Sequence, residues 1–230
     1  MTKAIEEIAK SHARSDVEVI AVNPERGPVS IESYYDEHLS APGVLEEVKK
    51  GIKQGVDGII IACFGDPALY ACREVADVPV VGIAEASMLM ACTLGHRFTV
   101  LTILERFKPL MEEVVKKYGL WERCASIRSS GLAVLEIEKD RKKTIETLTK
   151  VGRKAIEEDK AEVLCLGCAG MAGFDKELEK ALKIPVIDPV VAALMIVVSL
   201  VDYGKKTSKA FTFQYPEKKE IRGYSEILQP

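Results

Sequence analysis

Short apolar runs alternate with amphipathic helical stretches along almost the whole chain, and this alternation most constrains the fold. Most of the runs are continuously apolar, as expected for strands covered on both faces. Alternating strands and helices predict parallel sheets with right-handed crossovers, so the fold class is α/β. The runs predicted to be strands are residues 17–22, 58–63, 78–83, 98–103, 125–128, 163–167 and 185–187.

The chain also contains an internal repeat. Residues 58–69, GIIIACFGDPAL, are followed by VPVVGIAEAS, and residues 163–173, VLCLGCAGMAG, are followed by IPVIDPVVAA. In each half a buried strand ends in a cysteine, a glycine-containing turn and a helix follow, and the next strand opens with a proline. Cys63 lies 16 residues before Pro79, and Cys168 lies 17 residues before Pro185. The repeat predicts two lobes of similar topology, residues 1–96 and 97–204.

One strand of the repeat has no counterpart. The two cysteines are 105 residues apart, and this shift places the counterpart of strand 98–103 just before Met1. The first lobe would then lack a strand, which would leave backbone groups unpaired in its sheet. We expect in-frame codons upstream of Met1 to encode that strand, and a stop codon immediately before Met1 would contradict this.

Two cysteines carry the predicted chemistry. Cys63 and Cys168 each follow a strand at its carboxyl end, where open α/β sheets gather ligands, and facing lobes would bring the two sulfurs together in a cleft. Small residues after each cysteine are expected to open a helix, whose N–H groups would lower the thiol pKa and hold an enolate oxygen. One thiolate would remove a proton from a carbon next to a carbonyl while the other thiol returns one to the opposite face. We therefore predict a racemase that needs no metal and no cofactor.

The remaining cysteines are predicted to be packing residues, because a free cysteine is usually a small buried hydrophobic side chain. Cys72, Cys92 and Cys124 have no partner in the repeat. Cys165 forms a CxxC motif with Cys168, which is found in zinc and redox sites. Residues three apart in a strand point to opposite faces, however, so Cys165 is expected to face away from the site.

Four other polar residues are candidates for the cleft. Asp66 and Glu85 follow strand ends, and they would either line the cleft or cap helices. Asp188 precedes a proline, a position typical of a helix N-cap. Thr102 lies near the end of a predicted strand, where it would either donate to a substrate carbonyl or remain within the sheet.

Composition limits the partners and the compartment. The net charge of −3 gives no reason to expect nucleic acid, which needs a clustered basic surface. The N-terminal sequence shows no secretory signal, and the most apolar stretch, residues 190–201, is too short to span a bilayer and is predicted to be a buried helix. We therefore expect a cytoplasmic protein with no membrane partner and with its six cysteines reduced.

The repeated motifs resemble a known family. IIACFGDPAL with VVGIAEAS, and LGCAGM with PVIDPV, are similar to hydantoin racemases, which together with allantoin racemases belong to the aspartate/glutamate racemase superfamily. The likeness continues through NPERGPVSIESYYDEH and the TSK at residues 207–209, so it covers nearly the whole chain. The family begins with a strand and an INPN-like loop, and this sequence starts after both.

The resemblance implies two pseudo-symmetric α/β lobes with the active site in the cleft between them. It implies a two-base mechanism by Cys63 and Cys168, no cofactor, a homo-oligomer, and a tail at 205–230 that packs on the first lobe. Amino-acid racemases of the superfamily carry Asn or Thr after each cysteine, whereas the apolar residues here suit a hydantoin ring. The implied substrate contacts are Phe64, Gly65, Ala169, Gly170 and Met171.

The predicted activity is racemisation of 5-substituted hydantoins or allantoin, and two alternatives stay open. An aspartate or glutamate racemase would use the same sulfurs, but it would need cations for a second carboxylate. Arg73 and Arg97 are the basic residues nearest to the expected loop ends. A non-catalytic small-molecule-binding protein, derived from a racemase by loss of the strand, is the other alternative.

Overall fold

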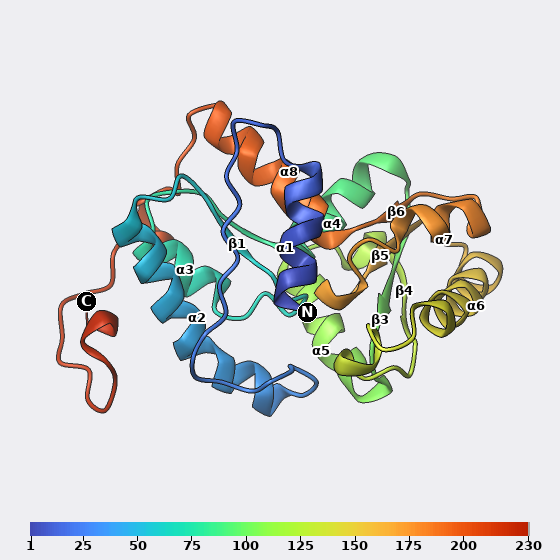
Figure 1. Ribbon diagram of the computed structural model, residues 1–230, viewed down its shortest axis with the longest axis horizontal. Coiled ribbons are helices and arrows are strands. Elements are labelled where there is room, and N and C mark those ends of the chain that lie inside the picture. The colour runs from blue at the N-terminus through green and yellow to red at the C-terminus, as the bar shows by residue number, and fades with distance from the viewer. Residues whose placement is uncertain (230) are drawn as a thin grey trace.

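The strands form two separate parallel sheets in the computed structural model, which describes residues 1–229 (Figure 1). One sheet pairs β1 (Ile59–Ile61) with β2 (Val80–Gly82). The other has the order β4-β3-β5-β6 and consists of β3 (Phe98–Thr102), β4 (Cys124–Ser129), β5 (Val163–Leu166) and β6 (Val186–Ile187). The predicted α/β class and parallel pairing are confirmed. We call the parts of the chain around the two sheets the first and second lobes; the lobe boundaries at 96/97 and 204/205 stay a prediction.

The helices lie between and around these strands. Local signals set some of their ends: the Ser33 hydroxyl accepts the Asp36 N–H at the start of α2, and Gly55 ends that helix with a φ of 79°. The helices are α1 (Thr2–His12), α2 (Tyr34–Gln54), α3 (Leu69–Val75), α4 (Ile83–Leu94), α5 (Lys108–Lys117), α6 (Arg141–Asp159), α7 (Asp175–Leu182) and α8 (Pro189–Asp202).

Two of the helices cross between the lobes. α4 follows β2 of the first sheet but packs against β5 and β6 of the second, and α8 follows β6 but packs against β1 and β2. The two helices also pack against each other, and Figure 1 shows α8, in orange, extending from the second lobe towards the first. The apolar run at 190–201 is helical, as predicted, but only one side of it is buried, at Val190, Ala192, Ala193, Leu194 and Val197, and Met195 is 40% exposed. No helix within residues 1–229 is long and apolar enough to cross a membrane.

The core is continuous around the second sheet. Every residue of β3 and β5 is buried, which explains why both strands are unbroken runs of Val, Leu, Thr, Phe and Cys rather than alternating patterns. A smaller cluster around Val48, Ile61, Leu69 and Val80 holds the first sheet between α2 and α3.

The predicted strand at 17–22 is not formed, and that prediction is wrong. The segment is extended, but no backbone N–H from residue 18 to residue 31 has a hydrogen-bond partner among residues 1–229. Ile20 and Val22 are 59% and 58% exposed. In the second sheet β4 pairs only with β3, and the first sheet has no counterpart of β3 within the described chain. An extended segment without a neighbour cannot form a ladder.

The C-terminal tail lies against the first lobe. The ammonium of Lys209 donates to the carbonyls of Arg73 and Glu74, and the N–H of Thr207 donates to the carbonyl of Asp77. Farther along, Lys49 of α2 donates to the carbonyl of Gln229. These contacts fasten the tail to the elements that surround β1 and β2.

Candidate active site

Cys63 lies in a tight turn after β1. The N–H of Asp66 donates to the Cys63 carbonyl at 2.9 Å, and the N–H of Gly65 donates to the sulfur. The side chain is partly exposed. The next α-helix, α3, begins only at Leu69, so the helix that the sequence predicted directly after Cys63 is absent.

Cys168 occupies a matching turn after β5. The N–H of Met171 donates to the Cys168 carbonyl at 3.0 Å, and the N–H groups of Gly170 and Met171 donate to the sulfur. Residues 169–171 form a single 3₁₀ turn with Cys168 at its N-cap. A Cβ on Gly167 would lie 2.8 Å from the Leu101 carbonyl oxygen, so only glycine lets this end of β5 approach β3 so closely.

Burial controls the acidity of both thiols. It raises the pKa of Cys63 to about 12 and the pKa of Cys168 to about 11. The N–H groups lower both values in the predicted direction, but the loss of hydration outweighs them. The expectation of lowered thiol pKa values is therefore wrong. A charge on Cys168 also raises the pKa of Cys63, so the sulfurs of the two lobes are near enough to interact.

The groups that act on the cysteines from nearby elements are acidic. Glu37 of α2 raises the pKa of Cys63, and Glu32 and Glu138 raise that of Cys168. Burial raises the pKa of Glu37 itself, and its Oε1 would lie 3.2 Å from a Cβ on Gly65. The surroundings of the two sulfurs therefore disfavour additional negative charge.

The predicted substrate contacts surround the two turns. Phe64 and Gly65 are buried beside Cys63, and Ala169, Gly170 and Met171 are buried beside Cys168. Their contact with a substrate stays a prediction.

Thr102 ends β3 and is completely buried. Its Oγ1 is the one buried side-chain oxygen or nitrogen within the described chain that has no hydrogen-bond partner. Buried hydroxyls are normally paired, and this free hydroxyl keeps Thr102 a candidate for binding substrate.

Asp66 has partners within the protein. Its carboxylate is 1% exposed and accepts the N–H groups of Ala84 and Glu85, at 3.1 and 2.9 Å, and the hydroxyl of Tyr118 at 2.7 Å. Loss of hydration raises its pKa to about 7. Of the two roles considered from the sequence, helix capping is present, and substrate contact stays a prediction.

The remaining candidates take structural positions. Asp188 is the N-cap of α8, as predicted. Glu85 forms an ion pair with Arg73, whose guanidinium also donates to the Val80 carbonyl. Cys165 is buried, and its sulfur contacts the Ser87 carbonyl of α4 at 3.7 Å, so it points into the packing between α4 and the second sheet.

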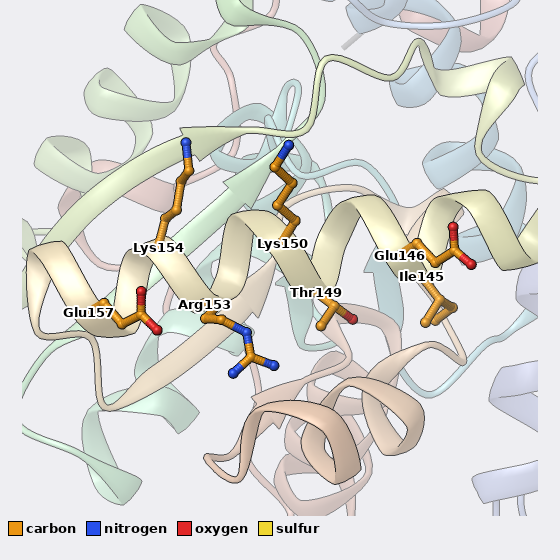
Figure 2. A pocket seen from close by; sticks show the side chains of 7 residues that line it. All are labelled: Ile145, Glu146, Thr149, Lys150, Arg153, Lys154 and Glu157. Atoms are coloured by element: carbon orange, nitrogen blue, oxygen red, sulfur yellow. The ribbon is translucent and has the colours of Figure 1, made fainter.

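The protein surface has a hollow beside the first cysteine turn and another along α6. One, of about 300 Å³, adjoins the first cysteine turn at Gly65 and is also lined by Glu37, Leu110, Glu113, Val114 and Lys117. The other, of about 530 Å³, runs along one face of α6 and contains none of the predicted site residues (Figure 2). Figure 2 shows side chains of α6 alone lining it, with Lys150 and Lys154 on one side of the helix and Arg153 on the other.

Sequence reasoning missed two residues near Cys63. Tyr118 continues the apolar periodicity of α5, which predicts a packing residue and not a hydrogen-bond donor. Only tertiary packing brings its hydroxyl to Asp66. Gly82 was detectable in principle, because it is the counterpart of Asp188 in the repeat IPVIDPVVAA.

A two-lobed α/β protein with a cysteine at the same strand end of each lobe has the architecture of a racemase, and the comparisons with known proteins agree. The family described as Asp/Glu/Hydantoin racemase matches residues 1–197. The hydantoin racemase of Pseudomonas sp. (strain NS671) is 55% identical over 223 residues, which cover 97% of this chain and 90% of that protein. The hydantoin racemase of Rhizobium meliloti is 43% identical and covers 93% and 88%.

The allantoin racemase from Klebsiella pneumoniae has a TM-score of 0.96 and 40% identity, covering 100% of this chain and 94% of that one. The chain belongs to the Asp/Glu/Hydantoin racemase family. It is accordingly an enzyme of the racemase class.

Proposed function

We propose that this enzyme racemises 5-substituted hydantoins or allantoin through Cys63 and Cys168 acting as two bases. The observation that carries the proposal is the matched placement of the cysteines. Each cysteine follows a parallel strand, and the carbonyl of each accepts the N–H of the residue three positions later. A negative charge on Cys168 also raises the pKa of Cys63. The names of the relatives support hydantoins and allantoin as the substrate class.

The proton transfers balance without another reactant. The thiolate of one cysteine removes the proton from C5 of the ring, and the C–H electron pair moves to the neighbouring carbonyl as an enolate. The thiol of the other cysteine then donates its proton to C5 from the opposite face. The second sulfur is left as the thiolate, ready for the other enantiomer or for proton exchange with water. We propose that no metal or cofactor takes part.

Thr102 is proposed to stabilise the enolate. Its buried Oγ1 has no partner among the described residues, so it is free to donate to a carbonyl oxygen that becomes more negative during the reaction. The N–H groups of Gly65, Gly170 and Met171 are directed at the two sulfurs, where they favour whichever cysteine is the thiolate.

The charges around the site favour a neutral ring over an amino dicarboxylate. Glu32, Glu37 and Glu138 all oppose negative charge at the sulfurs. The guanidinium of Arg73 forms an ion pair with Glu85, so its charge is already balanced within the protein. Arg97 precedes β3 and therefore lies at the opposite strand end from the cysteines. We further propose a cytoplasmic homo-oligomer with a small-molecule substrate and no nucleic-acid or membrane partner.

The test incubates the enzyme in D₂O with one enantiomer of benzylhydantoin, allantoin, aspartate or glutamate, and follows both optical rotation and deuterium at the reacting carbon by NMR. We expect racemisation with deuterium incorporation for a hydantoin or for allantoin. Racemisation of aspartate or glutamate alone would establish the amino-acid alternative, and no labelling of any compound would favour the non-catalytic alternative.

Cys63→Ser and Cys168→Ser test the mechanism in the same assay. Each is expected to lower kcat by a factor of about 10² or more, because a serine hydroxyl is a far weaker acid than a thiol: it donates its proton less readily and is almost never ionised to act as the base. Cys72→Ser, in the first lobe but outside the turn, is the matched control and should keep racemisation. Full activity in both active-site variants would overturn the two-cysteine mechanism.

A further inference from the structure

The helices that cross between the lobes begin at equivalent positions of the repeat. Gly82 is the N-cap of α4 and Asp188 is the N-cap of α8, both with extended backbone. Aligning VPVVGIAEAS with IPVIDPVVAA places Gly82 opposite Asp188. The first lobe therefore has no side chain at the position where the second lobe has a carboxylate.

In the second lobe this carboxylate joins two elements. Asp188 accepts the N–H groups of Val190 and Val191, at 2.9 and 3.1 Å, which caps α8. Its other oxygen accepts the N–H of Gly173 at 2.6 Å, and Gly173 lies five residues after Cys168. The side chain is 4% exposed. Asp188 thus fastens the Cys168 turn to the start of a helix that packs on the first sheet.

In the first lobe another residue supplies the same carboxylate. A Cβ on Gly82 would overlap Cγ of Asp66, so the Asp66 carboxylate fills the place of the missing side chain. It accepts the N–H groups of Ala84 and Glu85, the second and third residues of α4, as Asp188 does in α8. Asp66 itself belongs to the Cys63 turn.

We propose that Asp66 and Asp188 are positioning residues, which hold the Cys63 and Cys168 turns in matching geometry by fastening each turn to a helix packed on the opposite lobe. The proposal deepens the racemase function proposed above and rests on it for its effect on turnover. The hydroxyl of Tyr118, at the end of α5 in the second lobe, adds another link to Asp66. Asp188 has no such link to the opposite lobe within the described chain, where its hydrogen bonds all come from backbone N–H groups.

The exchange of residues 66 and 82 tests this directly. Asp66→Gly removes the carboxylate and suits the φ of 48° at that position. Combining it with Gly82→Asp rebuilds in the first lobe the arrangement of the second. Ala68 is the counterpart of Gly173, and both have a positive φ, 56° and 79°, so we expect the N–H of Ala68 to donate to the new carboxylate as that of Gly173 donates to Asp188.

We expect Asp66→Gly to lower kcat about tenfold, the usual consequence of losing hydrogen bonds to a buried charge, with little change in KM. The exchanged variant should recover to within about threefold of the wild-type kcat. Gly82→Asp alone places two carboxylates in one space and should be the least active of the three. An exchanged variant no better than Asp66→Gly, or a Gly82→Asp variant with wild-type kcat, would overturn the proposal.

Alkylation by iodoacetamide, with each cysteine followed by peptide mass spectrometry between about pH 7 and pH 9, gives a readout that does not depend on the substrate. Asp66 and Glu37 oppose the Cys63 thiolate, together with a charged Cys168. Asp66→Gly should therefore speed alkylation of Cys63 about threefold or more, with Cys168 and buried Cys72 unchanged, and the exchange should reverse it.

Asp188→Asn should speed alkylation of Cys168 and leave Cys63 unchanged. Asp202→Asn is the matched control, because Asp202 lies at the other end of α8, 14 residues after Asp188, and is exposed in its ion pair with Arg14. Equal acceleration of every cysteine would show general loosening and overturn the positioning role. If the wild-type enzyme racemises nothing while the alkylation pattern holds, the substrate assignment fails and the positioning role stands.

Discussion

The hydroxyl of Tyr118 donates a 2.7 Å hydrogen bond to Oδ2 of Asp66 and so joins the second lobe to the turn that carries Cys63. This bond lowers the pKa of Asp66, whereas burial raises it. The ionised carboxylate of Asp66 is therefore stabilised partly by a residue of the second lobe, and this hydrogen bond joins the two lobes at the Cys63 turn.

Tyr118→Phe should destabilise the protein more at about pH 8 than at about pH 5. The variant keeps the ring but leaves the buried carboxylate with one donor fewer, at a cost of about 1–3 kcal/mol when the group is ionised. At the lower pH the carboxyl of Asp66 is protonated and the loss is smaller. Urea unfolding at both pH values measures the difference. Equal destabilisation at the two pH values would show that the hydroxyl does not act through the ionised carboxylate.

Asp66 should make the folded state less stable as the pH rises towards neutrality. Its folded pKa of about 7 lies above the ordinary value of 3.8, so between these values the folded protein binds a proton that the unfolded chain has released. The contribution of Asp66 protonation to the free energy of unfolding is fully present below about pH 4. It is lost as the pH rises through 7, and the loss is roughly 4 kcal/mol at most. Asp66→Asn should remove that part of the slope.

Urea unfolding of the wild type and Asp66→Asn at several pH values between about 4 and 8 checks this. Buried Asp188 and half-buried Glu37 also have raised pKa values, so the informative quantity is the difference between the two proteins. A difference that does not vary with pH would contradict the assignment of the slope to Asp66.

The fold was predictable wherever sequence pattern and tertiary environment agree. β3 and β5 are buried on both faces, so each appears in the sequence as a continuous run of mostly apolar residues that is easily recognised as a strand. Residues 17–22 are also rich in valine and isoleucine but have no strand beside them, and a strand forms only where a neighbour can pair with it.

The site was predictable only in its outline. The repeat identified Cys63 and Cys168, because their matching positions in the two halves can be read directly from the sequence. The signs of their pKa shifts were missed, since desolvation depends on side chains brought from other elements. The link from Tyr118 to Asp66 was missed for the same reason: 52 positions separate the two residues in the chain.

The high thiol pKa values predict that kcat/KM rises with pH. Below about pH 11 the fraction of thiolate in the free enzyme increases tenfold per pH unit, so log(kcat/KM) should climb with a slope of about 1 between pH 7 and 9. Initial rates by polarimetry with a substrate at low concentration check this. A plateau already below pH 7 would mean that the reactive sulfur is ionised in the free enzyme.

Cys165→Ala separates the CxxC motif from catalysis. The sulfur of Cys165 is packed against α4, so its removal should lower the free energy of unfolding by about 1–2 kcal/mol through a small cavity. Racemisation should persist with kcat within about twofold of wild type, because the side chain does not share the turn of Cys168. Activity loss as large as that of Cys168→Ser would instead assign the pair a joint chemical role.

The amide hydrogens of the parallel strands should exchange far more slowly than those of the segment that joins α1 to α2. The N–H groups of residues 18–31 have no partner within the described chain, so they should exchange at close to the rate of an unstructured peptide. Those of β3 and β5 lie in a buried ladder and should be protected by many orders of magnitude. Mass spectrometry of peptic peptides after seconds to hours in D₂O measures both. Strong protection at 18–22 would show that this extended segment has found a strand to pair with, and that the first sheet is larger than β1 and β2.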